Sequence, residues 1–153
     1  MPSPGRTLLC LVALTTIVGG YIADWNETHV YNPRWPPHAK FHNGQTMSMG
    51  AALGLTTLFF LYGPPASASA SSSSTSSTAA TQRLSLYTAS WIASLYWITQ
   101  LSALFYPGSL AVDPEFGEGQ PQVYICAVLL SCIVVGMGLE RKKIAAAEEK
   151  KGA

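Results

Sequence analysis

Charged side chains are scarce in this sequence, which has nine Lys or Arg and eight Asp or Glu among 153 residues. Soluble domains carry about 25% charged residues, against 11% here, so an ordinary soluble enzyme is excluded. The hydrophobic content of 48% excludes intrinsic disorder, because such a chain can bury enough apolar surface to fold. The net charge of +1 supplies no field that attracts a polyanion, so we expect no nucleic-acid partner.

Cysteine is also rare, and its placement excludes a disulfide framework. Cys10, Cys126 and Cys132 all lie within apolar stretches, whereas disulfide frameworks belong to small secreted chains with paired, regularly spaced cysteines. We expect three free cysteines that behave as small apolar side chains within helices.

Four stretches contain no charged residue at all: 7–23, 46–63, 84–106 and 123–139. A helix needs about 20 apolar residues to cross a bilayer, and its backbone must satisfy its own hydrogen bonds there. The predicted fold class is therefore all-α, an integral membrane four-helix bundle formed by a single domain, 1–153. The first stretch is similar to a signal peptide, but Tyr21 is too large for the position three residues before a cleavage site, so we expect a retained helix.

The remaining charges predict the orientation of the four spans. An even number of spans places both termini and the connection 64–83 on one side of the membrane. That side holds seven basic residues against two on the other, and the positive-inside rule makes it the cytosolic side. The seven are Arg6, Arg83, Arg141, Lys142, Lys143, Lys150 and Lys151, and the two are Arg34 and Lys40.

The segment 140–153 is predicted to be a charged cytosolic tail, and it ends Lys150-Lys151-Gly152-Ala153. This K-K-x-x pattern resembles the retrieval address of endoplasmic-reticulum membrane proteins, which a cytosolic receptor reads. We therefore predict a multi-pass protein of the endoplasmic-reticulum membrane, with an ordinary solvated tail as the alternative. The Ser/Ala-rich segment 64–83 is predicted to be a flexible linker.

Small residues line one face of each predicted span, and such faces let membrane helices pack closely. The second span contains Gly50-x-x-x-Gly54, a motif for close backbone approach. The third span also places Gln100 on its small face, so we expect Gln100 to point into the bundle. There it would act as an interhelical hydrogen-bonding group or as a polar contact to a ligand. The residues of this face are Ala89, Ala93, Tyr96, Gln100 and Ala103.

All three histidines of the chain, His29, His38 and His42, fall in the first loop, Asp24–Gln45. Loops this long are usually either functional or disordered, and the aromatic content of this one argues against disorder. Interfacial anchoring alone does not explain why every histidine lies in one loop. The loop is therefore the first place to look for chemistry.

The second helix is predicted to begin near Pro37, because proline is favoured at the first helical position. His38, His42 and Gln45 would then share one helix face. Two histidines at this spacing can chelate a metal ion. A bare pair is weak evidence, however, and no second His-rich motif supplies the ligands of a di-iron cluster. We expect no metal and no cofactor.

The alternative chemistry is general acid–base catalysis on a lipid-soluble substrate, with a histidine moving the proton. Carboxylates would orient the histidine, and an arginine would hold a polar group of the substrate. The predicted catalytic residues are His29, His38, His42, Asp24, Glu27 and Arg34. The predicted substrate-binding residues are Trp25, Trp35, Gln45 and Gln100. The competing interpretation is anchoring, because Trp, Tyr, His, Arg and Lys all gather at membrane surfaces.

The third loop carries Asp113, Glu115 and Glu118 and no basic residue. It lies on the same predicted side of the membrane as the histidines. We expect it either to supply a carboxylate to the first loop or to form a solvated acidic loop.

The run DWNETHVYNPRWPPHAKFHNGQTMSMG resembles the signature of a family of small, uncharacterised fungal four-span membrane proteins that share a domain of unknown function. The resemblance implies no particular reaction. In layout alone the chain is similar to sterol isomerase-like, DoxX-like and anthrone oxygenase-like proteins, which act on hydrophobic small molecules. Sterol isomerase-like proteins place carboxylates inside their helices, and the spans predicted here contain none.

The sequence thus predicts a membrane protein that binds or transforms a lipophilic metabolite in lipid or secondary metabolism, by isomerase, cyclase or cofactor-free oxygenase chemistry. The expected partners are the lipid bilayer, a lipophilic small molecule, and a membrane protein or a second copy of the chain. The alternative is a non-enzymatic membrane subunit or scaffold whose first loop binds a partner at the membrane surface.

Overall fold

The computed structural model describes residues 3–64 and 75–152, and within these ranges it contains four α-helices and no strand. A single short 3-10 turn, η1, follows the third helix. The helices are α1 (Pro4–Asp24), α2 (Pro37–Tyr62), α3 (Thr75–Ser102) and α4 (Pro121–Gly152), and η1 spans Ala103–Phe105. The all-α prediction is confirmed for the described part of the chain.

Proline begins three of the four helices, because the backbone N–H of the first helical residue makes no hydrogen bond within the helix. These residues are Pro4, Pro37 and Pro121. The predicted start of the second helix near Pro37 is therefore confirmed. In α1, the Ser3 hydroxyl also accepts a hydrogen bond from the backbone N–H of Arg6 at 3.3 Å, which caps the helix.

The third helix is longer than predicted. It begins at Thr75, inside the segment 64–83 that was expected to be a linker, so the end of that segment is helical. Residues 65–74 of the linker lie outside the described residues. Ala79 is buried in the core cluster. Packing against a neighbouring helix buries apolar side chains of this segment, which stabilises it as a helix.

The fourth helix likewise continues through the predicted tail, as far as Gly152. Ile144 is 8% exposed and belongs to the same core cluster as Ala79 of α3. An Arg83 guanidinium nitrogen lies 2.5 Å from a carboxylate oxygen of Glu148. The extension is therefore a two-helix contact between α3 and α4. Ala153, the last residue of the K-K-x-x pattern, lies outside the described residues.

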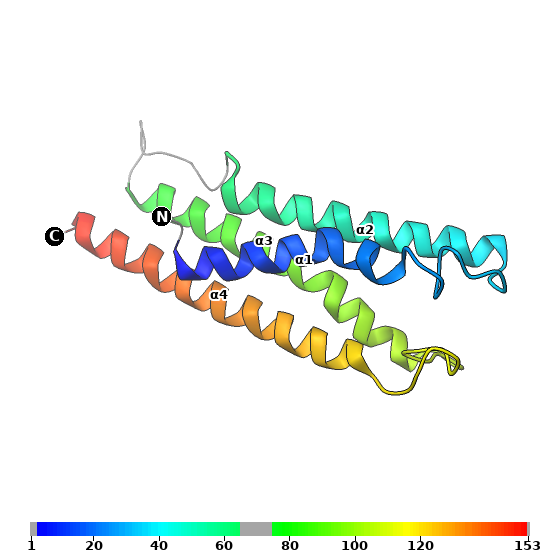
Figure 1. Ribbon diagram of the computed structural model, residues 1–153. Helices are drawn as coiled ribbons and strands as arrows, with labels where there is room; N and C mark the ends of the chain where they lie inside the picture. The colour runs from blue at the N-terminus through cyan, green and yellow to red at the C-terminus, as the bar shows by residue number, and fades with distance from the viewer. Residues whose placement is uncertain (1–2, 65–74, 153) are drawn as a thin grey trace.

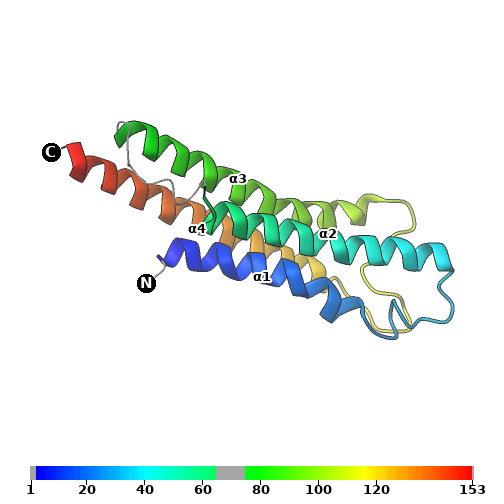
Figure 2. The ribbon, with the colours of Figure 1, turned by 90° about the horizontal axis from the view of Figure 1, so that it is seen from above.

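The four helices form a bundle in which each helix packs on the helix next to it in the sequence, and α4 packs back on α1. Helices α1 and α3 lie diagonally and touch only slightly, and the other diagonal pair, α2 and α4, is not in contact within the described residues. Both chain ends lie together at one end of the bundle, here called the terminal end (Figure 1). The loop between α1 and α2 and the loop between η1 and α4 lie at the opposite end, here called the loop end (Figures 1 and 2).

The core is held by apolar packing and by one buried interhelical hydrogen bond. Leu9 and Val12 of α1 are fully buried, and Trp97 of α3 is 4% exposed. The Trp97 indole N–H donates to the Thr16 hydroxyl at 3.1 Å, and that hydroxyl donates to the Val12 carbonyl oxygen at 2.8 Å. This pair of bonds satisfies both polar groups inside the bundle.

The Gly50-x-x-x-Gly54 motif lies where α2 meets α1. A Cβ atom added to Gly54 would come within 2.6 Å of the Ala13 carbonyl oxygen and 2.5 Å of an Ile17 side-chain carbon. A Cβ added to Gly50 would lie 3.0 Å from the Thr16 carbonyl oxygen. Only a residue without a side chain lets the two backbones approach this closely.

A second close approach joins α1 to α4 at the terminal end. A Cβ added to Gly5 would lie 2.6 Å from the Gly136 carbonyl oxygen, and one added to Gly136 would lie 3.0 Å from the Gly5 carbonyl oxygen. Beyond this crossing α4 runs away from α1 toward the loop end (Figure 1). The two helices are thus pinned together at one end only.

Glu140 is the one acidic side chain that the described part of the chain buries, with 3% of its surface exposed. Its carboxylate lies 3.1 Å from the Arg6 guanidinium and accepts a hydrogen bond from the Ser3 hydroxyl. Lys143 adds a weaker contact at 4.0 Å. Glu140 is the first residue of the predicted solvated tail, but its carboxylate is buried and paired with Arg6 of α1.

Two helices, α1 and α4, are long and apolar enough to cross a membrane. Helices α2 and α3 are long enough but less apolar, since they carry many Ser, Thr and Gln residues. All four helices nevertheless expose large apolar side chains, among them Leu11, Leu55, Trp91 and Val134. Such surfaces mark contact with lipid or with another protein.

The close contact at Gly54 predicts a specific sensitivity. We expect Gly54→Ala to lower the free energy of unfolding by about 1–3 kcal/mol, because the new methyl group overlaps α1 backbone. Gly138→Ala is the matched control, since a Cβ there meets nothing within 4 Å. Unfolding of the full chain in detergent, followed by circular dichroism during SDS titration, measures both. Equal effects of the two substitutions would contradict the close approach.

The buried carboxylate makes a second prediction. Replacing Arg6 with Met leaves Glu140 without its nearest cation, which we expect to lower the free energy of unfolding by about 2 kcal/mol. This is below the 3–5 kcal/mol of a fully buried pair, because the Arg6 side chain is 30% exposed. Arg141→Met, at an exposed neighbouring position, should change stability little in the same titration. If Arg6→Met were equally silent, the pair would not stabilise the fold.

Candidate functional site

A cavity of about 750 Å³ lies at the loop end of the bundle. It is bounded by the last three turns of α1, the first loop, the first half of α2, the ends of α3 and η1, the start of α4 and the loop that joins η1 to α4. Its walls are partly apolar and partly polar. The lining includes Gly19, Ala23, Asp24, His29, Tyr96, Gln100, Leu104, Ala111, Gln122 and Ile125.

The cavity follows from the packing of α1 and α4. These helices touch closely at Gly5 and Gly136 and separate toward the loop end (Figure 1). The residues of α1 that face the gap are small, including Gly19, Gly20 and Ala23. Diverging helices with small side chains leave a space that the core does not fill. The volume is within the range of about 300–1,000 Å³ typical of small-molecule sites.

Two amide oxygens of the cavity-lining residues are buried without a hydrogen-bond partner in the described part of the chain, namely Oε1 of Gln100 and Oε1 of Gln122. The Gln122 amide is oriented by its Nε2, which donates to the Ala111 carbonyl oxygen at 2.6 Å. Leaving a buried acceptor unpaired costs about 1–3 kcal/mol. Buried polar groups without partners are rare in proteins and call for an explanation.

Asp24 and His29 form the ionisable part of the cavity wall. One carboxylate oxygen of Asp24 lies 3.8 Å from Nδ1 of His29. The other accepts a hydrogen bond from the amide of buried Asn43 at 2.8 Å, which ties the end of α1 to α2. Asp24 is thus held in place by α2 while it faces the imidazole.

The hydrogen bonds around His29 determine which ring nitrogen carries the proton. The Asn26 amide nitrogen donates to the Ala23 carbonyl at 2.8 Å, so Asn26 Oδ1 faces Thr28 as an acceptor. The Thr28 hydroxyl therefore donates to this oxygen at 2.6 Å. Nδ1 of His29 lies 2.6 Å from the same hydroxyl oxygen and must be the donor. Nε2 of a neutral His29 is then left as a free base.

The first loop is folded around a buried asparagine. Asn32 is 1% exposed; its amide nitrogen donates to the Thr28 carbonyl at 3.4 Å, and its oxygen accepts from the backbone N–H of Arg34 at 2.9 Å. The Trp35 ring meets the His29 ring edge-on, with 4.7 Å between centroids. The loop therefore holds His29 against the cavity.

The other two histidines lie elsewhere. His38 and His42 are exposed on the first turns of α2, which project furthest at the loop end (Figure 2). Their Nε2 atoms are 3.0 Å apart, and Nδ1 of His42 lies 3.3 Å from the Gln45 amide oxygen. Neither histidine nor Gln45 lines the cavity. Within the described residues, no group of three or more His, Cys, Asp or Glu side chains is placed to hold a metal ion.

The remaining predicted site residues face outward. Arg34 forms an ion pair with Glu115, so the third loop supplies its carboxylate to an arginine rather than to a histidine. Glu27 is exposed. Trp25 is 53% exposed, and its indole N–H donates to the Tyr31 hydroxyl at 2.8 Å on the outer surface. Trp25 therefore lies on the outer surface and does not line the cavity.

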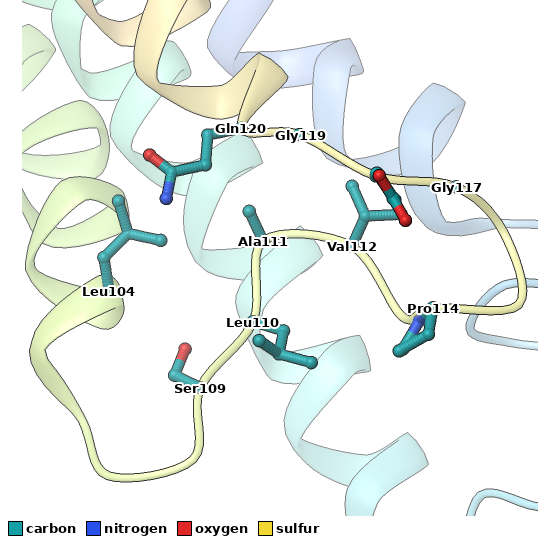
Figure 3. Close-up of a pocket in the computed structure, with 10 residues that line it drawn as sticks. Leu104, Ser109, Leu110, Ala111, Val112, Pro114, Gly117, Gly119 and Gln120 are labelled. Atoms are coloured by element: carbon teal, nitrogen blue, oxygen red, sulfur yellow. The ribbon is translucent and has the colours of Figure 1, made fainter.

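The third loop lines the cavity and also a smaller hollow of about 320 Å³. Residues 109–111 line both spaces. In Figure 3 the Gln120 amide and the Leu104 side chain point toward each other in this hollow, with Ala111 beside them. Gly117 and Gly119 have φ angles of 135° and 109°, which glycine adopts most readily, and they let the loop turn back to α4.

Sequence reasoning missed Gln122 and Asn43, and it treated Tyr96 only as part of a packing face. The signal for Tyr96 was present, because it lies four residues before Gln100 on one helix face. Gln122 stood at the edge of a predicted loop, and nothing in its spacing predicts that it lines the same cavity as Gln100. Asn43 gave no signal apart from being an amide on the second helix.

The signature of a family of unknown function, DUF6640, matches residues 8–151. The match includes every cavity residue described above, and it agrees with the predicted resemblance to an uncharacterised domain. No similar protein is found among the curated proteins, and none among the solved structures. The chain belongs to DUF6640, a family of unknown function.

Proposed function

We propose that this protein is a four-span protein of the endoplasmic-reticulum membrane that binds a lipophilic metabolite in the loop-end cavity and transforms it by proton transfer. Both termini would be cytosolic and the cavity would lie near the lumenal face. The observation that carries the proposal is the cavity itself. It combines apolar walls, unpartnered amide oxygens and an Asp24–His29 pair in one space.

The exposed surface supports a membrane location for all four helices. Large apolar side chains are exposed on α2 and α3 as well as on the two most apolar helices. The hydroxyls that lower the hydropathy of α2 and α3 are largely satisfied within their own helices. Thr56 and Thr57 donate to the carbonyls of Ala52 and Leu53, and Thr99 donates to that of Leu95, at 2.7–2.9 Å. Such bonds reduce the cost of placing a hydroxyl in lipid.

The chemistry that fits the site is acid–base catalysis by His29. Its Nδ1 proton is held by Thr28 beside the Asp24 carboxylate, and its Nε2 is free to accept a proton. Asp24 would stabilise the imidazolium that forms, and the histidine would return the proton at another position of the substrate. Such proton transfer is sufficient for an isomerase or cyclase reaction without a cofactor. A cofactor-free oxygenase also begins with removal of a proton from its substrate.

A second candidate function, a non-enzymatic subunit or scaffold, is supported by the projecting start of α2. Phe41 is 65% exposed there and its ring stacks with that of His38, with 6.1 Å between centroids. His42 extends the same surface. An exposed aromatic and imidazole surface of this kind suits a membrane interface or a protein partner.

The orientation has a direct test. We expect a C-terminal tag to be reached by antibody after the plasma membrane alone is permeabilised, because seven basic residues lie on that side. A tag inserted after Pro33, in the first loop, should be reached only after the endoplasmic-reticulum membrane is also opened. Immunofluorescence of producing cells measures both. A C-terminal tag reached only in the second condition would overturn the orientation and the retrieval signal.

The catalytic assignment predicts that His29→Gln removes a metabolite from the lipid extract of producing cells while protein abundance is unchanged. Glutamine keeps a polar side chain but cannot cycle a proton. The control is the double variant His38→Ala and His42→Ala, whose side chains lie outside the cavity and which should keep the wild-type metabolite profile. Mass spectrometry of the extracts, beside immunoblots, measures the outcome.

The converse result separates the two candidate functions. If His29→Gln leaves every metabolite unchanged while the double variant abolishes co-purification of a membrane partner, the enzyme proposal fails and the scaffold is supported. If both variants lower the abundance of the protein itself, all three histidine side chains are structural and the assigned role of His29 is lost.

A further inference from the structure

We infer that the ligand of the cavity is a neutral lipophilic alcohol, whose hydroxyl group donates a hydrogen bond to the amide oxygens of Gln100 and Gln122. This inference rests on the proposed function, because it names the chemical class that the cavity selects. It follows from the polarity of each group on the wall.

The wall offers acceptors. The Gln122 amide cannot turn without losing its bond, because its Nε2 already donates to the Ala111 carbonyl at 2.6 Å. Its Oε1 is buried and unpartnered among the described residues, as is Oε1 of Gln100. A ligand O–H is the group that satisfies such an oxygen; a ligand carbonyl or ether oxygen cannot, because it has no proton to donate.

Three of the five hydroxyl groups on the described wall are committed as donors, while those of Tyr96 and Ser109 also line the cavity. Thr15 donates to the Leu11 carbonyl at 2.9 Å, and Thr46 donates to the His42 carbonyl at 3.0 Å. Thr99 donates to the Leu95 carbonyl at 2.8 Å. Each hydroxyl has one proton, which is already used, so these three threonines can only accept a hydrogen bond from a ligand.

Anionic ligands are disfavoured by charge. No Lys or Arg is among the described residues that line the cavity, and Asp24 places a carboxylate on its wall. The nearest arginine of the first loop, Arg34, is already paired with Glu115. A fatty acid or a phosphate ester would therefore bring a second negative charge to a site without a fixed cation. An uncharged hydroxyl avoids this cost.

Access from the bilayer suits a lipophilic molecule. The cavity lies between the ends of α1 and α4, the two most apolar helices. Close in sequence to the lining residues Ala23 and Ile125, Ile22 on α1 and Tyr124 on α4 are 76% and 74% exposed. Between apolar helices that separate toward the loop end, the apolar part of a ligand can remain in lipid while its hydroxyl reaches the amides.

The test uses three probes that differ only at the polar end: tritiated 1-hexadecanol, its methyl ether and hexadecanoate. We expect the full chain in detergent micelles to bind the alcohol at least about tenfold more tightly than the ether or the acid, as one lost hydrogen bond or an added charge predicts. Gln100→Leu and Gln122→Leu should reduce alcohol binding to the level of the ether. Gln82→Leu, on the same helix but remote from the cavity, is the matched control and should bind like wild type.

A cavity-blocking variant separates this inference from the proposed function. Ala103 is an exposed residue of η1 that lines the cavity, so Ala103→Trp should fill the space without disturbing the core. If the three probes bind equally, and Ala103→Trp but neither glutamine variant removes binding, the cavity binds lipophiles but the selection of a hydroxyl is refuted. If no probe binds the wild-type chain, or binding survives Ala103→Trp, lipophile binding in this cavity is refuted as well.

Discussion

The close contact of α1 with two neighbours is the constraint on which the rest of the structure depends. Gly54 of α2 meets the α1 backbone near Ala13, and Gly136 of α4 meets it at Gly5. The first contact lies in the middle of α1 and keeps α1 and α2 together, whereas the second lies at one end. Since the close backbone contact between α4 and α1 lies only at the terminal end, the two helices diverge, and the cavity opens where they have separated.

The same geometry decides which polar groups become chemically useful. The end of α1 is tied to α2 through Asp24 and Asn43, and the first loop folds back on the cavity around buried Asn32. His29 is thereby held beside Asp24 with its Nδ1 proton engaged by Thr28. The start of α2 projects beyond this point, so His38 and His42 remain exposed. Two kinds of histidine environment thus arise within a few residues of each other, one in the loop and one on α2.

The helices could be predicted from the sequence because their causes are local. Pro37 begins α2 at the predicted place, and the Gly50-x-x-x-Gly54 spacing marks a close helix contact that the structure contains. The lengths of α3 and α4 could not be predicted from hydropathy, since their extensions are stabilised by contacts between the two helices. Arg83 with Glu148 and Ala79 with Ile144 belong to such contacts. The pairing of Arg34 with Glu115 was likewise invisible, because it joins two loops far apart in the chain.

By itself the sequence determined that the chain forms apolar helices with charge confined to their ends, because spacing and hydropathy act within each segment. It also determined that acid–base groups are concentrated beside the first loop, since all three histidines occur there. Only the tertiary structure decided that His29 lines a cavity, that His38 and His42 do not, and that Gln100 shares its wall with Gln122. Those outcomes depend on where helices diverge and how loops fold back, which is a property of packing between distant segments.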